Sequence, residues 1–165
     1  MQRPVLGVAP DIAESAFVSE VAYAVGDVTV GERSGLWPFA CLRGDGGSTV
    51  VGDETNVQEF SMLHGATIGD GVTLGHGVVI DYATVEDGSL VGMSSTVQRD
   101  AVVEEDCLVA ANSLVTEGQT VPSGHLAYGA PAETRPIRER HLEEIARVRE
   151  LYVDHVEAYK RAGLE

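Results

Sequence analysis

The most regular feature of this chain is an aliphatic residue that recurs at about every sixth position from residue 18 to residue 126. A period of six fits neither an α-helix nor the simple alternation of a β-strand. It predicts a solenoid of short strands in which each flat face points one aliphatic side chain inward. The repeating positions are Val18, Ala24, Val30, Leu36, Leu42, Val51, Val57, Leu63, Ile68, Leu74, Ile80, Val85, Val91, Val97, Val103, Val109, Val115 and Val121.

The predicted fold is therefore an all-β solenoid, a parallel β-helix of hexapeptide repeats. Three hexads make one coil of roughly eighteen residues, and coils stack at the usual strand spacing of about 4.8 Å. The longer interval between Leu42 and Val51 predicts that the sequence RGDGGST forms a small bulging loop. Two shortened hexads, residues 63–67 (LHGAT) and 80–84 (IDYAT), are near copies that lie one coil apart.

The repeat divides the chain into three segments. Residues 1–126 form the predicted β-helix domain, and residues 127–136 (AYGAPAETRP) form a connector that contains proline and glycine. Residues 137–165 have a helical pattern, which predicts a C-terminal α-helix packed along the solenoid or onto a neighbour. Its apolar face would carry Ile145, Val148, Tyr152, Val156 and Tyr159, and Gly163 is placed to end it.

The charge balance limits the classes of partner that this chain could bind. Acidic residues outnumber basic ones 26 to 11, and the formal net charge is −15. A chain this acidic is a poor candidate for binding nucleic acid or an anionic membrane. Lys160 is its only lysine. Abundant acid with almost no lysine suggests a protein kept soluble at very high salt, where screening removes self-repulsion, so a halophilic source such as an archaeon is a hypothesis.

The cellular compartment is predicted from cysteine usage and from the apolar segments. Cys41 and Cys107 lie far apart and do not suggest a disulfide framework, so we expect buried thiols in a reducing cytoplasm. No basic start followed by an apolar run indicates a signal peptide, and no apolar stretch has the length of a membrane span. We therefore expect a cytoplasmic, soluble protein.

Two histidines and an aspartate form the candidate site. His64 and Asp81 each follow the first aliphatic of a shortened hexad, so they should stack on the same edge one rung apart. His76 follows an aliphatic that begins a different face, so one subunit cannot direct all three side chains at one ion. A neighbouring subunit could supply His76, because triangular prisms pack naturally around a threefold axis. Two imidazoles and a carboxylate suit a divalent metal.

The chain resembles the gamma-class carbonic anhydrase family of left-handed β-helix proteins over nearly its whole length. That resemblance implies a homotrimer with one divalent metal at each subunit interface, zinc in the first place, with iron or cobalt as alternatives. Its ligand positions fall on His64, on His76 from the adjacent subunit, and on Asp81, where the family has a third histidine. The matching segments are residues 37–38 (WP), 42–45 (LRGD), 55–59 (TNVQE), 61–69 (SMLHGATIG), 73–80 (TLGHGVVI), 91–97 (VGMSSTV) and 128–132 (YGAPA).

The resemblance also implies roles for four other residues. Arg43 and Asp45 correspond to residues that support the subunit interface near the metal, where an arginine can clamp a carboxylate. Gln58 corresponds to a glutamine that hydrogen-bonds near the metal-bound solvent, and Tyr128 to an active-site aromatic of some members. Glu59 should point away from Gln58, because strand side chains alternate.

Two departures from the family pattern remove its acidic proton-transfer groups. Only residues 65–67 separate His64 from the next hexad, where other members can insert an acidic loop. Gly46 stands where active members can carry a glutamate. No obvious proton shuttle remains in the sequence.

The Asp81 substitution bears directly on the chemistry. In the family, the metal lowers the pKa of bound water and supplies hydroxide, which attacks carbon dioxide and yields bicarbonate. An aspartate ligand brings negative charge, so the bound water should be less acidic and bicarbonate held less strongly. Three outcomes stay open. Asp81 binds the metal, or Asp81 does not reach the metal and water completes a two-histidine site. In the third, the site holds no metal and the protein is a structural trimer.

The sequence thus leaves three functions. The first is a carbonic-anhydrase-like metalloprotein with weak or altered hydration of carbon dioxide, in which Asp81→His should raise the rate. The second is a non-catalytic assembly trimer of the same fold. The third is a different enzyme on the same prism, either a metal-dependent hydrolase of thioesters or an acyltransferase. The acyltransferase has little support, because the chain lacks the long loop and dedicated catalytic histidine that such enzymes usually carry.

Overall fold

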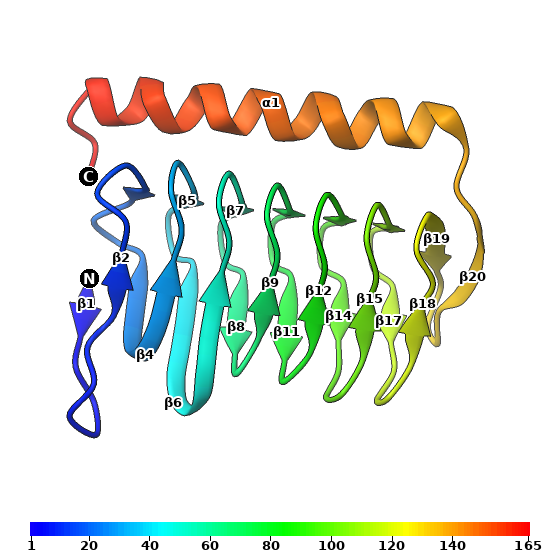
Figure 1. Ribbon diagram of the computed structural model, residues 1–165, viewed down its shortest axis with the longest axis horizontal. Helices are drawn as coiled ribbons and strands as arrows, with labels where there is room; N and C mark the ends of the chain where they lie inside the picture. The colour runs from blue at the N-terminus through cyan, green and yellow to red at the C-terminus, as the bar shows by residue number, and fades with distance from the viewer.

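The structure, a computed structural model that describes residues 1–165, is a parallel β-solenoid of about seven coils with one C-terminal helix. Figure 1 shows the coils stacked side by side along the long axis, with helix α1 (Glu139–Arg161) lying across them from the last coil back to the first. The fold predicted from the hexads, an all-β solenoid of hexapeptide repeats plus a C-terminal helix, is confirmed.

The strands belong to two sheets that build three faces. The first sheet covers two faces, because the long strands β4 and β6 turn from one face to the next. Its strands are β1 (Gln2–Arg3), β2 (Asp11–Ile12), β4 (Tyr23–Val30), β6 (Cys41–Val51), β8 (Met62–His64), β9 (Thr67–Ile68), β11 (Val79–Asp81), β12 (Thr84–Val85), β14 (Thr96–Val97), β15 (Val102–Val103), β17 (Leu114–Val115) and β18 (Thr120–Val121). The second sheet contains β3 (Phe17–Val18), β5 (Gly35–Leu36), β7 (Asn56–Val57), β10 (Thr73–Leu74), β13 (Leu90–Val91), β16 (Leu108–Val109), β19 (His125–Tyr128) and β20 (Glu133–Pro136).

The core is the column of repeat aliphatics inside the coils. Every predicted position from Ala24 to Val121 is buried, with at most 2% of its surface exposed, and Val18 packs against the column from the first coil. Apart from the antiparallel pair of β19 and β20, the strand pairs are parallel, and equivalent hexads lie in register, as in Leu63 opposite Ile80. The hexad rule therefore predicts both burial and register.

The corners of the prism explain how so short a repeat closes a coil. Many corner residues have positive φ, among them Gly65 (φ 58°) and, one coil on, Tyr82 (φ 50°). Glycine adopts this left-handed conformation freely, whereas a residue with a Cβ adopts it at a cost in free energy. The predicted loop over RGDGGST is a bulge within β6: Gly26 pairs with Gly44 and Val28 with Thr49, so residues 45–48 protrude.

Helix α1 covers the face built by the second sheet. It contacts β3, β5, β7 and β10, and its buried residues are Ile145 and Val156. Tyr152 and Tyr159 pack edge-on against Trp37, with ring centroids 5.4 and 5.0 Å away. The segment predicted as a connector contains β20, which pairs antiparallel with β19. The helix of this chain is not long and apolar enough to cross a membrane.

Candidate functional site

The candidate site is built on the equivalent strands β8 and β11. Asp81 lies opposite His64 in the register of these strands, as the two shortened hexads predict. The Asp81 Oδ1 atom is 3.0 Å from His64 Nδ1. An ionised carboxylate only accepts hydrogen bonds, so His64 Nδ1 carries a proton and donates it to Asp81. Asp81 therefore orients His64 within the subunit, so that Nε2 points away from Asp81.

The bulge of β6 brings a second carboxylate to the other side of the imidazole. Asp45 Oδ1 is 3.4 Å from His64 Nε2, while Asp45 Oδ2 accepts a hydrogen bond from Arg43 Nη2 at 2.8 Å. This arginine lowers the pKa of the Asp45 carboxyl below its ordinary value, mainly through that hydrogen bond. Asp45 Oδ1 itself is buried and has no hydrogen-bond partner. A buried acceptor without a partner is costly, so this atom needs an explanation.

Tyr82 packs against the imidazole of His64 and contacts its Nε2 atom. Its hydroxyl oxygen lies 3.4 Å from His64 Nε2, and the two rings meet edge-on with centroids 4.7 Å apart. The Arg99 guanidinium carbon stands 4.0 Å from the centroid of the Tyr82 ring. The sequence patterns did not single out Tyr82 as a site residue. The available signal was its place in the second shortened hexad, where the first hexad has Gly65.

His76 lies elsewhere in the subunit, at the corner that follows β10. Its Nδ1 is 2.7 Å from Glu59 Oε2, and about half of the imidazole surface is exposed. Glu59 does point away from the buried Gln58, and that orientation puts its carboxylate on His76. The sequence did not predict this contact, although Glu59 and His76 are separated by one coil. The contact with Glu59 uses Nδ1, so His76 Nε2 takes no part in it.

Gln58 and Tyr128 have contacts of their own. Gln58 is buried, donates a hydrogen bond to Asn56 Oδ1 at 3.1 Å, and borders a groove between β10 and α1. Tyr128, on β19, lies 3.4 Å from a carboxylate oxygen of Glu133 through its hydroxyl. Neither side chain touches His64 in the subunit, so their roles at the site stay predictions.

Histidine–carboxylate pairs of the kind found in metal sites occur twice in the subunit. Within one subunit no three histidine, cysteine, aspartate or glutamate side chains converge as a metal site. Each histidine nevertheless has a carboxylate on Nδ1, Asp81 for His64 and Glu59 for His76, so Nε2 is the ring atom that a metal could bind. Metal-binding histidines typically have this arrangement, because the carboxylate fixes the tautomer and raises ligand basicity. The buried Asp45 Oδ1 is a third acceptor beside His64.

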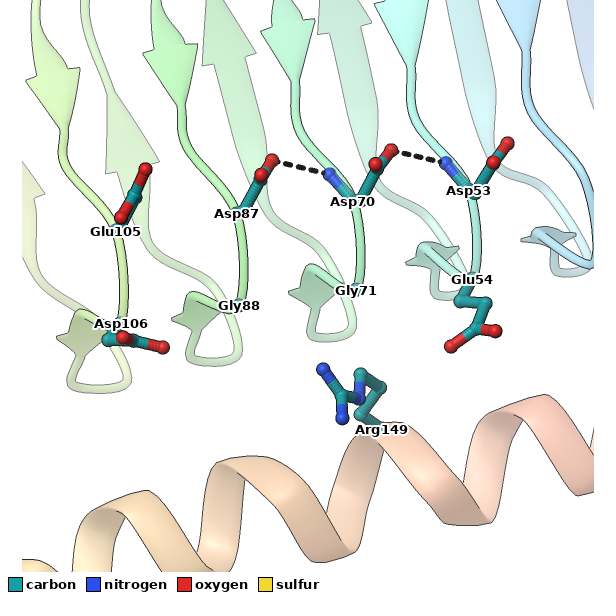
Figure 2. Close-up of a pocket in the computed structure, with 9 residues that line it drawn as sticks. All are labelled: Asp53, Glu54, Asp70, Gly71, Asp87, Gly88, Glu105, Asp106 and Arg149. Atoms are coloured by element: carbon teal, nitrogen blue, oxygen red, sulfur yellow. Dashed lines mark hydrogen bonds between the residues drawn. The ribbon is translucent and has the colours of Figure 1, made fainter.

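A second concave region, of about 500 Å³, lies at a different corner under α1 (Figure 2). Six carboxylates and Arg149 line it. The carboxylates form a ladder: Asp70 Oδ1 accepts the Asp53 backbone N–H, and Asp87 Oδ1 accepts that of Asp70, both at 2.8 Å. These aspartates satisfy backbone groups at the turns between coils. The ladder is therefore explained by coil stacking, with Arg149 as the cation that faces it.

Comparison with known proteins gives both full-length and partial relatives. No protein-family model matches the chain. The uncharacterized transferase YtoA of Bacillus subtilis is 44% identical over 157 residues, which cover 92% of each chain. The carbonic anhydrase of Geobacillus kaustophilus is 41% identical over 64 residues, 39% of this chain and only 35% of that protein. The likeness to the carbonic anhydrase is thus confined to about a third of its length.

Solved structures agree with the fold over the whole chain. A hexapeptide transferase family protein from Anaplasma phagocytophilum superimposes with a TM-score of 0.87 at 32% identity, covering 96% of this chain and 97% of that one. A proposed acetyltransferase of Bacillus cereus gives a TM-score of 0.90 at 31% identity, covering 98% of this chain and 97% of that one. The chain therefore belongs to the hexapeptide-repeat superfamily that contains the gamma-class carbonic anhydrases and the hexapeptide transferases.

Proposed function

We propose that this protein is a carbonic-anhydrase-like metalloprotein that hydrates carbon dioxide weakly at the subunit interfaces of a homotrimer. The observation that carries the proposal is the pair of carboxylate-held imidazoles, His64 on Asp81 and His76 on Glu59. In this proposal each interface holds one divalent metal, zinc in the first place, between His64 and His76 of a neighbouring subunit. Iron or cobalt would suit the same donors.

The residues of the chain would bind and orient the reactants. Asp81 and Glu59 hold the two imidazoles in the tautomer that exposes Nε2. Arg43 keeps the Asp45 carboxylate ionised beside His64, and the Tyr82 ring packs edge-on against the imidazole. The metal, when bound, would supply a Lewis acid that lowers the pKa of water. Nearby carboxylates oppose that effect, which supports weak rather than fast hydration.

The metal and the reaction are tested together by one experiment. The full-length protein is purified with added zinc, and metal content and carbon dioxide hydration are measured for the wild type, His64→Ala and His76→Ala. We expect close to one zinc per subunit in the wild type and loss of both metal and hydration in either variant. Less than a tenth of an ion per subunit in the wild type would reject the metalloprotein in favour of an assembly trimer.

An acyltransferase is the second candidate, because the relatives that match the full length are described as transferases. Two observations fit it. The Asp81–His64 pair has the arrangement of a general base, with a carboxylate orienting the imidazole. A largely apolar groove of about 420 Å³ lies under α1, between Leu90, Leu108 and Leu151. Binding of acetyl-CoA by calorimetry, lost when Leu108→Glu blocks the groove, would favour this function over hydration.

A further inference from the structure

The imidazole of His64 faces an unsatisfied acceptor. With Nδ1 donating to Asp81, Nε2 lies on the other side of the ring, 3.4 Å from Asp45 Oδ1. Asp45 Oδ1 is buried and has no hydrogen-bond partner, and its carboxylate is kept ionised by Arg43. A divalent cation between His64 Nε2 and Asp45 Oδ1 would bind both atoms and give the buried oxygen the partner that it lacks.

The separations around Nε2 match those of donor atoms on one metal ion. Metal–nitrogen and metal–oxygen bonds of about 2.0–2.2 Å place the corners of a tetrahedron about 3.3–3.6 Å apart. Asp45 Oδ1 and the Tyr82 hydroxyl oxygen are each 3.4 Å from His64 Nε2. At 3.4 Å the Tyr82 contact is longer than a typical O–H···N hydrogen bond, but it has the length of a tetrahedral edge.

Three glycines make the space in which the Tyr82 hydroxyl reaches this point. A Cβ at Gly65 would lie 2.6 Å from the Tyr82 ring, and one at Gly47 would lie 3.3 Å from it. A Cβ at Gly46 would overlap the hydroxyl oxygen itself. Tyr82 also holds its left-handed backbone (φ 50°) at the corner where the preceding coil has Gly65. The bulge and the corner are thus shaped around a tyrosine that ends at His64.

We propose that His64 Nε2, Asp45 Oδ1 and Tyr82 Oη bind one divalent cation within the subunit, and that Asp81 supports His64 without ligating. This inference rests on the metal of the proposed function and changes its ligands. His76 of a neighbouring subunit would supply a further ligand, as the shared site of the proposed function requires. Binding replaces the phenol proton of Tyr82 with the metal and releases that proton to solvent, so the phenolate oxygen becomes a ligand.

Copper(II) is the probe, because a phenolate bound to copper(II) gives a visible charge-transfer absorption that imidazole and carboxylate ligands do not give. Metal-free full-length protein is titrated with copper(II), and absorption, copper content and proton release are recorded. We expect the band in the wild type, and we expect Tyr82→Phe to abolish it and to release one proton fewer per copper. Tyr82→Phe and Asp45→Asn should each weaken binding at least about tenfold.

Two control variants separate the ligands from their surroundings. Tyr23→Phe removes the hydroxyl of an exposed tyrosine on β4, so it should leave the band and the affinity unchanged. Asp81→Asn should keep the band, because Asp81 touches only Nδ1. Copper that binds through His64 without a charge-transfer band would overturn this ligand set and leave the proposed metalloprotein standing. No copper bound to the wild type would overturn both.

Discussion

Tyr82 and Gly46 should be energetically coupled, and a double-mutant cycle measures the coupling. Gly46 has a φ outside the left-handed region, so alanine fits its backbone. The added Cβ would overlap the Tyr82 hydroxyl oxygen, and the next atoms, His64 Nε2 and Tyr82 Cζ, would be 3.6 and 3.7 Å away. Removing only the hydroxyl with Tyr82→Phe therefore turns the overlap into ordinary contact.

Two opposing effects set the change in the free energy of unfolding that Gly46→Ala should cause. Overpacking costs about 1–3 kcal/mol when the neighbour cannot move, and here the Tyr82 ring is held between Gly47, Gly65 and Arg99. Against this, Gly→Ala stabilises by about 0.4–1 kcal/mol through the unfolded chain. We expect Gly46→Ala to destabilise the wild type by about 0.5–2 kcal/mol. In the Tyr82→Phe background the same change should be neutral or stabilising by up to about 1 kcal/mol.

The coupling energy is obtained from urea unfolding of the wild type, Gly46→Ala, Tyr82→Phe and the double variant. All four are measured at one protomer concentration, because the stability of an oligomer depends on concentration. The predicted coupling is about 1–3 kcal/mol. If Gly46→Ala has the same effect in both backgrounds, the Tyr82 hydroxyl does not occupy the space over Gly46. The description of the site around His64 would then be wrong.

The core, the charge ladder and the ligand set give three further predictions. Leu63→Ala empties a fully buried core position and should cost about 3 kcal/mol or more in urea unfolding; a cost below about 1 kcal/mol would contradict the packed column. Arg149→Gln removes the base that faces six carboxylates, so it should lower Tm in dilute buffer but not in about 1 M KCl; equal loss in both would exclude an electrostatic cause. The double variant Asp81→His, Tyr82→Gly removes the Asp81 carboxylate and the proposed Tyr82 phenolate and adds a neutral imidazole. It should hydrate carbon dioxide faster than the wild type or Asp81→His alone. An equal or slower rate would show that another step limits hydration.

Much of the fold is predictable because the hexad repeat is a local rule with one physical cause. Each aliphatic from Ala24 to Val121 must be buried inside the coil, so its spacing predicts both the core and the register. The hexad spacing also predicts that Asp81 lies against His64, and the paired strands β8 and β11 bear this out. The bulge at residues 45–48 was expected from the long interval after Leu42, but it belongs to strand β6.

The contacts around His64 could be predicted only in part. The hexads predict the coil and the face on which a residue lies. They do not predict where the side chains of a protruding loop end. Asp45 reaches Nε2 from such a bulge, and Tyr82 reaches it across space left by glycines. Both depend on side-chain directions at corners, where backbone geometry differs from that of strands. Glu59 was expected to face away from Gln58, yet its contact with His76 there depends on the three-dimensional corner.

The central claim is that each metal site is shared between His64 of one subunit and His76 of the next. It is tested most directly by mixing two variants, His64→Ala and His76→Ala, unfolding them together and refolding them as mixed trimers in the presence of zinc. Neither variant alone should hold zinc, while random mixing should restore about a quarter of the interfaces, because that fraction pairs an intact His64 with an intact His76. Zinc held in full by His76→Ala alone, or no zinc regained on mixing, would contradict the shared site.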